Sequence, residues 1–181
     1  DGAWEKEKVI FRYPNNKPLY QCVLRIELWH MRTITALKSQ EVLLGSVELT
    51  TSPLGKLMGQ KGLITKWLAI TPEEDALDTS SFSPEIQVKG GPHGGADIFE
   101  DCDEHLLLDI LAATRLPLRK ESAGQPDTRP NIFCEVTWNQ KRIGRTAVVD
   151  GSANPLWDRQ RFIMRIPLIT TLTGTSILSH C

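Results

Sequence analysis

Residues 130–167 read PNIFCEVTWNQKRIGRTAVVDGSANPLWDRQRFIMRIP, and this stretch decides the fold of the chain. Short runs of apolar and β-branched residues with a period of two alternate here with turn residues, a pattern typical of β-strands. We therefore predict strands at residues 131–138, 142–149 and 161–166. Helical periodicity is almost absent, so the stretch favours an antiparallel β-structure.

The same alternation continues toward the N-terminus, on both sides of a central acidic segment. In the run CVLRIELW at residues 22–29, Leu24, Ile26 and Leu28 share one face, and the residues between them share the other. Helix is expected only around residues 53–58 and near Cys102. Eight short strands with turns between them predict an all-β fold, an antiparallel Greek-key β-sandwich. The five further strands are expected at residues 9–13, 22–29, 43–49, 66–70 and 105–112.

One strand pattern occurs twice. When Trp4 is set against Trp157, DGAWEKEKVIFRYP lies over NPLWDRQRFIMRIP, so that Ile10 meets Ile163 and Pro14 meets Pro167. In each copy a Trp that we expect to be buried introduces an alternating strand. Each strand then ends at a Pro, whose missing N–H stops a hydrogen-bonded ladder from continuing.

Composition and length limit the protein class. The chain has 181 residues, of which 40% are apolar and 24% are charged, so a packed core is expected. This length excludes a large multidomain enzyme. No apolar run approaches the roughly 20 residues of a membrane-spanning helix. Because the sequence starts with Asp1 and not with Met, we interpret it as a piece of a longer protein.

The near-neutral net charge of -1 conceals a strong segregation. Residues 71–104 contain ten acidic residues and one base, whereas the rest of the chain contains 20 bases and 12 acidic residues. The acidic segment also includes TSSFSP and GGPHGG, so we predict a flexible linker there. The basic remainder favours anionic partners.

Residues 130–167 resemble the first half of a C2 domain. That family has an Asn-Pro-x-Trp-Asn/Asp motif followed by a Phe-x-Phe strand, and HLLLDILAATRL at residues 105–116 is similar to its opening strand. Residues 24–49 resemble the second half of the domain, and KWLAI at residues 66–70 resembles its closing strand. The signature residues of the resemblance are Trp4, Trp29, Gly45, Trp67, Asn154, Pro155 and Trp157.

The order of the two halves leaves two arrangements open. Residues 1–70 are similar to the second half of one C2 domain, residues 71–104 form the predicted linker, and residues 105–181 are similar to the first half of a following domain. The chain is then a window from a multi-C2 protein. Alternatively, the two halves close into one permuted sandwich, since the two strand topologies of the family are circular permutants of one another.

The resemblance implies a module that binds lipid or protein. Calcium-binding members of the family use clustered Asp carboxylates, but His30, Arg32, Val42, Gln125 and Asn131 stand at those positions. Calcium needs six to eight oxygen ligands, so we expect no calcium binding and no other metal site. Basic residues on two strands are instead the predicted lipid-binding face: Lys141, Arg142, Arg145, Arg159, Arg161 and Arg165.

The function predicted from the sequence is calcium-independent, peripheral binding to anionic phospholipid membranes within a larger multi-C2 protein. A protein-interaction scaffold without lipid binding is the alternative. We expect no enzyme activity, catalytic residue or cofactor, because no nucleophile has a base at a motif spacing. Nucleic acid is not expected as a partner. The four cysteines are scattered without a C-x-x-C pair, which predicts reduced thiols and a cytoplasmic location.

Overall fold

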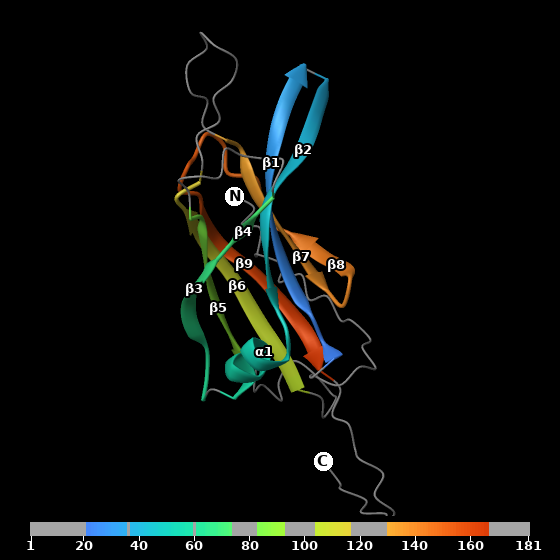
Figure 1. Cartoon of the computed structure of the whole chain (residues 1–181), viewed down its shortest axis with the longest axis vertical. Coiled ribbons are helices and arrows are strands. Elements are labelled where there is room, and N and C mark those ends of the chain that lie inside the picture. The colour runs from blue at the N-terminus through green and yellow to red at the C-terminus, as the bar shows by residue number, and fades with distance from the viewer. Residues whose placement is uncertain are drawn as a thin grey trace, which may run out of the picture.

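The computed structural model describes residues 21–35, 37–59, 61–73, 83–92, 104–116 and 130–166. Two antiparallel sheets pack face to face in these residues, with one short helix at one end (Figure 1). The predicted antiparallel β-sandwich is therefore confirmed. The predicted strand at residues 9–13, the signature residue Trp4 and the predicted helix near Cys102 lie outside the described residues.

The larger sheet has five strands, which are, in spatial order, β4 (Thr71–Pro72), β2 (Lys38–Leu49), β1 (Leu24–Thr35), β7 (Ile132–Trp138) and β8 (Lys141–Arg145). The smaller sheet has four, in the order β3 (Ile64–Ala69), β5 (Glu85–Pro92), β6 (Glu104–Thr114) and β9 (Leu156–Ile166). Helix α1 (Thr51–Met58) follows β2, close to the position expected from the sequence.

The core lies between the two sheets and follows the period of two. Leu24, Ile26 and Leu28 are buried on β1, as predicted from their alternation. Side chains of the same periodicity face them from the other strands, and burying apolar area of this kind contributes about 25 cal/mol per Å². These include Ile86, Val88, Leu106, Leu108, Ile110, Cys134, Val136, Trp138, Phe162 and Met164.

Both sheets contain strands from both sides of the acidic segment. Strand β1 pairs antiparallel with β7, and β3 is joined to β6 through β5. Of the two arrangements that the sequence left open, the described residues therefore adopt the closed one. Its physical basis is that half a sandwich would leave an apolar face and an unpaired strand edge in water.

One prediction is wrong within the acidic segment. Residues 85–92 were expected to belong to the flexible linker, but they form the strand β5 between β3 and β6. Ile86 and Val88 alternate with polar residues there and are fully buried. The acidic, Gly- and Pro-rich composition of the neighbouring residues concealed this short alternation. The two-residue strand β4 also lies in the predicted linker.

Several strand ends differ from their predicted positions. Strands β1 and β2 are longer than expected, because the two continue as a paired ribbon. The strand predicted at residues 142–149 ends at Arg145, and Val149 forms only an isolated bridge with Ile132. Strand β9 begins at Leu156, five residues earlier than predicted.

The signature residues on β9 and before it are structural. The Trp157 side chain is buried, and its Nε1 donates a 2.9 Å hydrogen bond to the carbonyl oxygen of Ala147. Asn154 Oδ1 accepts a hydrogen bond from Thr114 Oγ1 at 2.9 Å. The carbonyl oxygen of Pro155 accepts one from the Ala113 amide at 3.0 Å. This turn therefore fastens the start of β9 to the end of β6.

Two further signature residues are Gly45, which lies against β4 in the large sheet, and Trp67, which lies on an edge strand of the small sheet. At Gly45, a Cβ atom would lie 2.5 Å from the carbonyl oxygen of Thr71, so only glycine lets β4 pair with β2 there. Trp67 lies on the edge strand β3 and is 46% exposed, so this signature residue is not part of the core.

Two tryptophans provide a test of this core. Trp138 is fully buried on β7, and we expect Trp138→Ala to lower the free energy of unfolding by about 3–5 kcal/mol, the usual cost of truncating a buried aromatic. Trp67→Ala is the matched control and should cost less than about 1 kcal/mol. Urea unfolding followed by circular dichroism measures both, and equal costs would contradict this placement of the core.

Candidate functional site

The β1–β2 hairpin extends beyond the rest of the sandwich (Figure 1). Strand β7 pairs with β1 only as far as His30, and β4 pairs with β2 only at Gly45 and Ser46. Past these points β1 and β2 hydrogen-bond to each other as a two-stranded ribbon that closes at the pair Thr35 and Lys38. The sandwich therefore presents this ribbon away from its core.

The tip of the ribbon is apolar and is flanked by bases. Leu37 is 99% exposed and Ile34 is 47% exposed, whereas most large apolar side chains of the described residues are buried. Lys38 is exposed and Arg32 is half-buried close to the tip. Exposed apolar residues rimmed by polar ones are typical of protein or membrane contacts. The sequence analysis missed this feature, because alternation alone does not reveal how far a hairpin protrudes.

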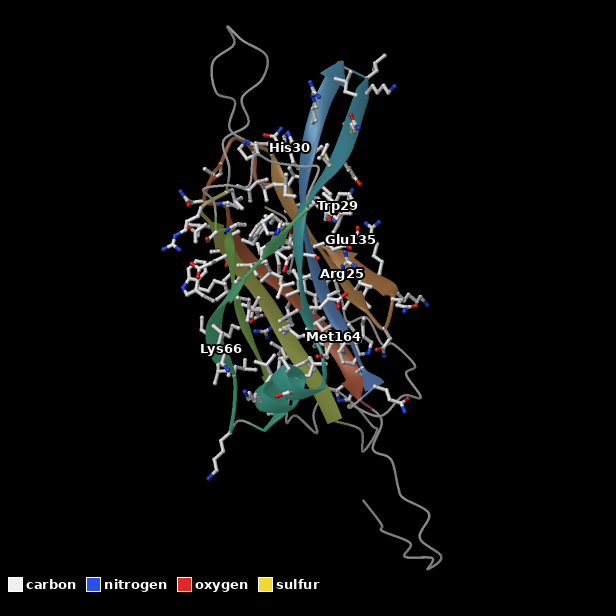
Figure 2. All side chains as sticks on the ribbon, viewed as in Figure 1. Arg25, Trp29, His30, Lys66, Glu135 and Met164 are labelled. Carbon is white, nitrogen blue, oxygen red and sulfur yellow. The ribbon has the colours of Figure 1, made fainter. Side chains whose placement is uncertain are left out.

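The base of the ribbon brings together residues from three segments. His30 lies opposite Val42 on one side and Ile132 on the other. Its Nδ1 lies 3.2 Å from both the amide nitrogen and the carbonyl oxygen of Asn131. Asn131 Oδ1 accepts a 2.9 Å hydrogen bond from the amide of Gly151. Figure 2 shows His30 where the ribbon leaves the sandwich.

These are positions at which the sequence comparison expected calcium ligands. The structure brings His30, Val42 and Asn131 together, as the resemblance implied, but it brings together an imidazole, an isopropyl group and an amide. Gln125 lies outside the described residues. In the part of the chain that the structure describes, no group of three or more His, Cys, Asp and Glu side chains is placed to hold a metal ion.

The predicted lipid-binding bases whose side chains the structure describes do not share one sheet. Lys141, Arg142 and Arg145 lie on β8 in the large sheet, whereas Arg161 lies on β9 in the small sheet. The prediction of one shared face is therefore wrong, since adjacent segments of the chain enter opposite sheets. The structure does not describe the side chains of Arg159 and Arg165.

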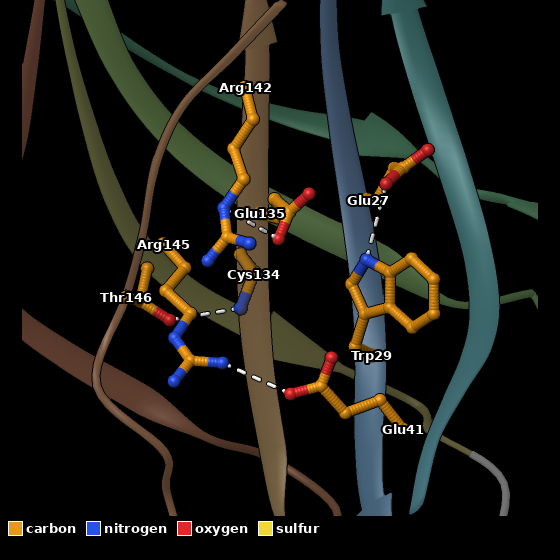
Figure 3. Close-up of polar contacts among 8 residues, drawn as sticks. All are labelled: Glu27, Trp29, Glu41, Cys134, Glu135, Arg142, Arg145 and Thr146. Atoms are coloured by element: carbon orange, nitrogen blue, oxygen red, sulfur yellow. Dashed lines mark hydrogen bonds and ion pairs between the residues drawn. The ribbon is translucent and has the colours of Figure 1, made fainter.

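Three of these arginines have acidic partners. Arg142 Nε lies 3.0 Å from Glu135 Oε2, and Arg145 Nη1 lies 3.0 Å from Glu41 Oε1 (Figure 3). Arg161 forms a bidentate pair with Asp109, in which Nε and Nη2 donate hydrogen bonds of 2.7 and 2.9 Å. This pairing raises the pKa of Arg161. Exposed pairs contribute little to stability, but they reduce the positive field of these strands.

An aromatic stack lies on the outer face of the large sheet. The rings of Trp29 and Phe133 are nearly parallel with centroids 6.4 Å apart, and the Arg145 guanidinium lies 5.3 Å from the Phe133 centroid. Trp29 Nε1 donates a 3.2 Å hydrogen bond to Glu27 Oε2 (Figure 3). Because β7 and β1 separate β8 from β2, Arg145 extends across Phe133 to reach Glu41.

Two groups on β7 have shifted pKa values, Cys134 on its core face and Glu135 on its outer face. Burial raises the pKa of the Cys134 thiol, and the amide of Cys134 donates a 2.9 Å hydrogen bond to Thr146 Oγ1. Burial also raises the pKa of the Glu135 carboxyl, an effect that the Arg142 charge opposes and that Glu27 and Glu41 reinforce. The outer face is therefore a network of mixed charge.

Comparison with known proteins gives one match. The model of the C2 domain family matches residues 104–175, a range that includes strands β6, β7, β8 and β9. No curated protein and no solved structure matches the chain. Among the described residues, no helix has the length and apolarity that crossing a membrane requires.

The raised pKa of Glu135 predicts a pH dependence. Because the folded state holds this proton more tightly than the unfolded state, the contribution is fully present below the ordinary glutamate pKa of about 4.3 and is lost as the pH rises through the folded pKa. Glu135→Gln removes the titration. We expect the unfolding free energy of the wild type, relative to this variant, to fall between about pH 4 and pH 7.

Urea unfolding at several pH values measures this difference. Thr137→Ser on the same strand is the control, since it introduces no titrating group. A difference between wild type and Glu135→Gln that stays constant over this range would contradict the assignment.

Proposed function

This chain contains a C2 domain, and we propose that the domain binds peripherally to anionic phospholipid membranes without calcium. C2 domains are generally membrane- or protein-binding modules. The observation that carries the proposal is the apolar tip of the β1–β2 ribbon, where Leu37 is almost fully exposed between two basic residues. The ribbon tip is defined here as Ile34, Leu37, Arg32 and Lys38.

The magnitudes of the two contributions suit weak, reversible binding. Moving a Leu or Ile side chain fully out of water contributes about 1.5–3 kcal/mol. Each Lys or Arg near an anionic leaflet contributes about 1 kcal/mol, within a Debye length of about 8 Å at physiological salt. After the cost of association is subtracted, these terms leave only a small surplus, which gives weak and reversible binding. Avidity from further domains of a longer protein would strengthen the binding.

Calcium independence is proposed from the side chains at the base of the ribbon. A hard cation binds through carboxylate and carbonyl oxygens. His30 and Asn131 contact each other there, and Arg32 adds a positive charge nearby. Asn131 offers one amide oxygen, which already accepts a hydrogen bond from the Gly151 amide, so these groups supply neither the negative charge nor the six to eight oxygen ligands that calcium requires. Arg32 would instead face an anionic lipid headgroup directly.

The predicted bases on β8 and β9 have a secondary place in this proposal. Arg142, Arg145 and Arg161 are paired with carboxylates, so their charges are already partly neutralised. Lys141 is exposed at the start of β8. Lipid contacts of these residues stay a prediction, and we expect the ribbon tip to contribute more.

Protein docking is the second candidate function. The outer face of the large sheet favours it, because Trp29 and the surrounding ion pairs combine an aromatic surface with mixed charge. Interfaces are enriched in Trp and Arg. In either case we propose a binding module without catalytic activity or cofactor. We propose a cytoplasmic, membrane-peripheral location, which accords with the reduced, buried thiols of Cys22 and Cys134 among the described residues.

Substituting the tip should remove membrane binding. We expect Ile34→Ser/Leu37→Ser to weaken binding to phosphatidylserine-containing vesicles at least tenfold, because the two side chains lose more than the 1.4 kcal/mol that a tenfold change represents. Leu156→Ser is the matched control, since Leu156 is 74% exposed on another strand. Vesicle co-sedimentation measures all three proteins. Equal binding by both variants would contradict the role of the tip.

The charges should act independently of calcium. We expect vesicle binding to be the same in millimolar calcium and in chelator, and to fall as salt rises from 50 to about 300 mM. Lys38→Glu should weaken binding, whereas Lys66→Glu, on the distant strand β3, should change it little (Figure 2). Binding that requires calcium would contradict the proposal. If the protein binds no vesicles under any of these conditions, the result would favour protein docking as the function.

A further inference from the structure

Strand β3 lies at one edge of the small sheet and has a free side. Within the described sheet order, β5 is its neighbour on one side and no strand lies on the other. Thr65, Lys66, Trp67 and Ala69 are exposed on this strand, and Figure 1 shows β3 on the outside of the sandwich. An exposed edge strand offers its unpaired backbone groups to another chain.

The register of β3 against β5 shows which backbone groups are free. In an antiparallel ladder, pairs that exchange two hydrogen bonds alternate with pairs that exchange none. The Ile70 amide donates a 2.9 Å hydrogen bond to the carbonyl oxygen of Pro84, and the same register continues along β3. The even-numbered residues of β3 therefore bond to β5. The N–H and C=O groups of Thr65, Trp67 and Ala69 point to the free side instead.

The side chains of β3 alternate between the two faces of the small sheet. Ile64 and Leu68 pack against the core, so Trp67 projects from the outer face, where it is 46% exposed. Tryptophan is enriched among the residues that contribute most to binding at protein interfaces. Directly opposed side chains on neighbouring strands contact each other. A strand added beside β3 would therefore pack one of its side chains against the Trp67 ring.

The surroundings of β3 are basic. Residues 50–72 contain three lysines and no Asp or Glu. Lys61 and Lys66 are exposed, and Figure 2 shows Lys66 on the outer side of the sandwich. Glu85, at one end of the β3–β5 ladder, already lies 3.4 Å from the guanidinium of Arg115. This local excess of positive charge favours a ligand with carboxylates.

We propose that β3 binds an extended, acidic peptide of a partner protein, which adds to the small sheet as a fifth, antiparallel strand. Backbone hydrogen bonds to Thr65, Trp67 and Ala69 provide the affinity, as in other complexes formed by strand addition. The peptide residue opposite Trp67 is apolar, and the next residue, opposite Lys66, is acidic. This inference does not rest on the proposed membrane binding, which involves the β1–β2 ribbon of the other sheet.

The lysines favour such a partner over a second copy of this chain. Two β3 strands paired with each other would bring Lys61 and Lys66 of both copies close together, and residues 50–72 offer no carboxylate to neutralise them. Lysine on an edge strand is a common means of preventing self-association. The same charge attracts an acidic peptide.

A synthetic peptide tests the proposal with the full chain. The probe is acetyl-Thr-Val-Ile-Glu-Thr-Glu-Glu-amide, in which the Ile is designed to lie opposite Trp67 and the first Glu opposite Lys66. Isothermal titration calorimetry measures its affinity. We expect saturable binding that weakens about tenfold when all three Glu are replaced by Gln. No binding of the probe, or equal binding of the Gln peptide, would overturn the proposal.

Methylated peptides distinguish strand addition from a contact between charges alone. N-methylation of the Ile removes an N–H that points at β3, so we expect it to abolish measurable binding. N-methylation of the first Glu is the matched control, because the N–H of that residue points away from β3 in an antiparallel pair. Equal affinities of the two methylated peptides would contradict strand addition.

Substitutions on β3 locate the site. Trp67→Ala should weaken binding of the probe about tenfold, whereas Leu156→Ala, at the exposed start of the opposite edge strand β9, should leave it unchanged. Thr65→Pro removes an N–H only on the free side, where proline is tolerated in edge strands. It should therefore block binding and keep the circular-dichroism spectrum. Probe binding that neither Trp67→Ala nor Thr65→Pro reduces would overturn the assignment to β3.

Amide hydrogen exchange, followed by NMR, provides a readout without any substitution. The probe should slow exchange at Thr65, Trp67 and Ala69 several-fold, because these amides gain an acceptor. Exchange at Ile64 and Lys66, whose amides already bond to β5, should change less. Slowed exchange on other strands only would overturn the proposal. A dimer that forms without the probe and that Thr65→Pro abolishes would identify a second copy as the occupant, and would overturn it as well.

Discussion

The antiparallel pairing of β1 with β7 is the interaction on which the rest of the structure depends. Seven residue pairs, from Leu24 opposite Trp138 to His30 opposite Ile132, join two segments that are more than 100 residues apart in the chain. This ladder places β1 and β7 at the centre of the large sheet. It therefore aligns their alternate apolar side chains above the small sheet, where the core forms.

The length of this ladder also determines the candidate site. Because β7 stops pairing with β1 at His30, the remaining residues of β1 have only β2 as a partner and continue as a ribbon. The same boundary brings Asn131 against His30 and so assembles the base of the ribbon. The protrusion of the tip and the contact of Asn131 with His30 at the base are thus two consequences of where one strand pairing ends.

The ion pairs on the two sheets join residues that are far apart in the sequence. Arg145 pairs with Glu41 across two intervening strands, and Arg161 pairs with Asp109, 52 residues away. The sequence alone suggests that these arginines form a cationic surface, but in the fold each of them pairs with a carboxylate. In the proposed function, the bases of the ribbon tip, Arg32 and Lys38, therefore carry more weight than the paired arginines of β8 and β9.

The sequence by itself determined the strand class, the buried face of β1 and the resemblance to C2 domains, because a period of two and turn residues are local properties. It also predicted, from that resemblance, that His30, Arg32 and Asn131 stand where calcium-binding members have carboxylates. Only the tertiary structure decided that both halves close into one sandwich, that residues 85–92 form a strand inside the acidic segment, and that β8 and β9 enter different sheets. The physical reason is that strand partners, and the acids that neutralise each arginine, are chosen by contacts between distant residues, which local alternation does not specify.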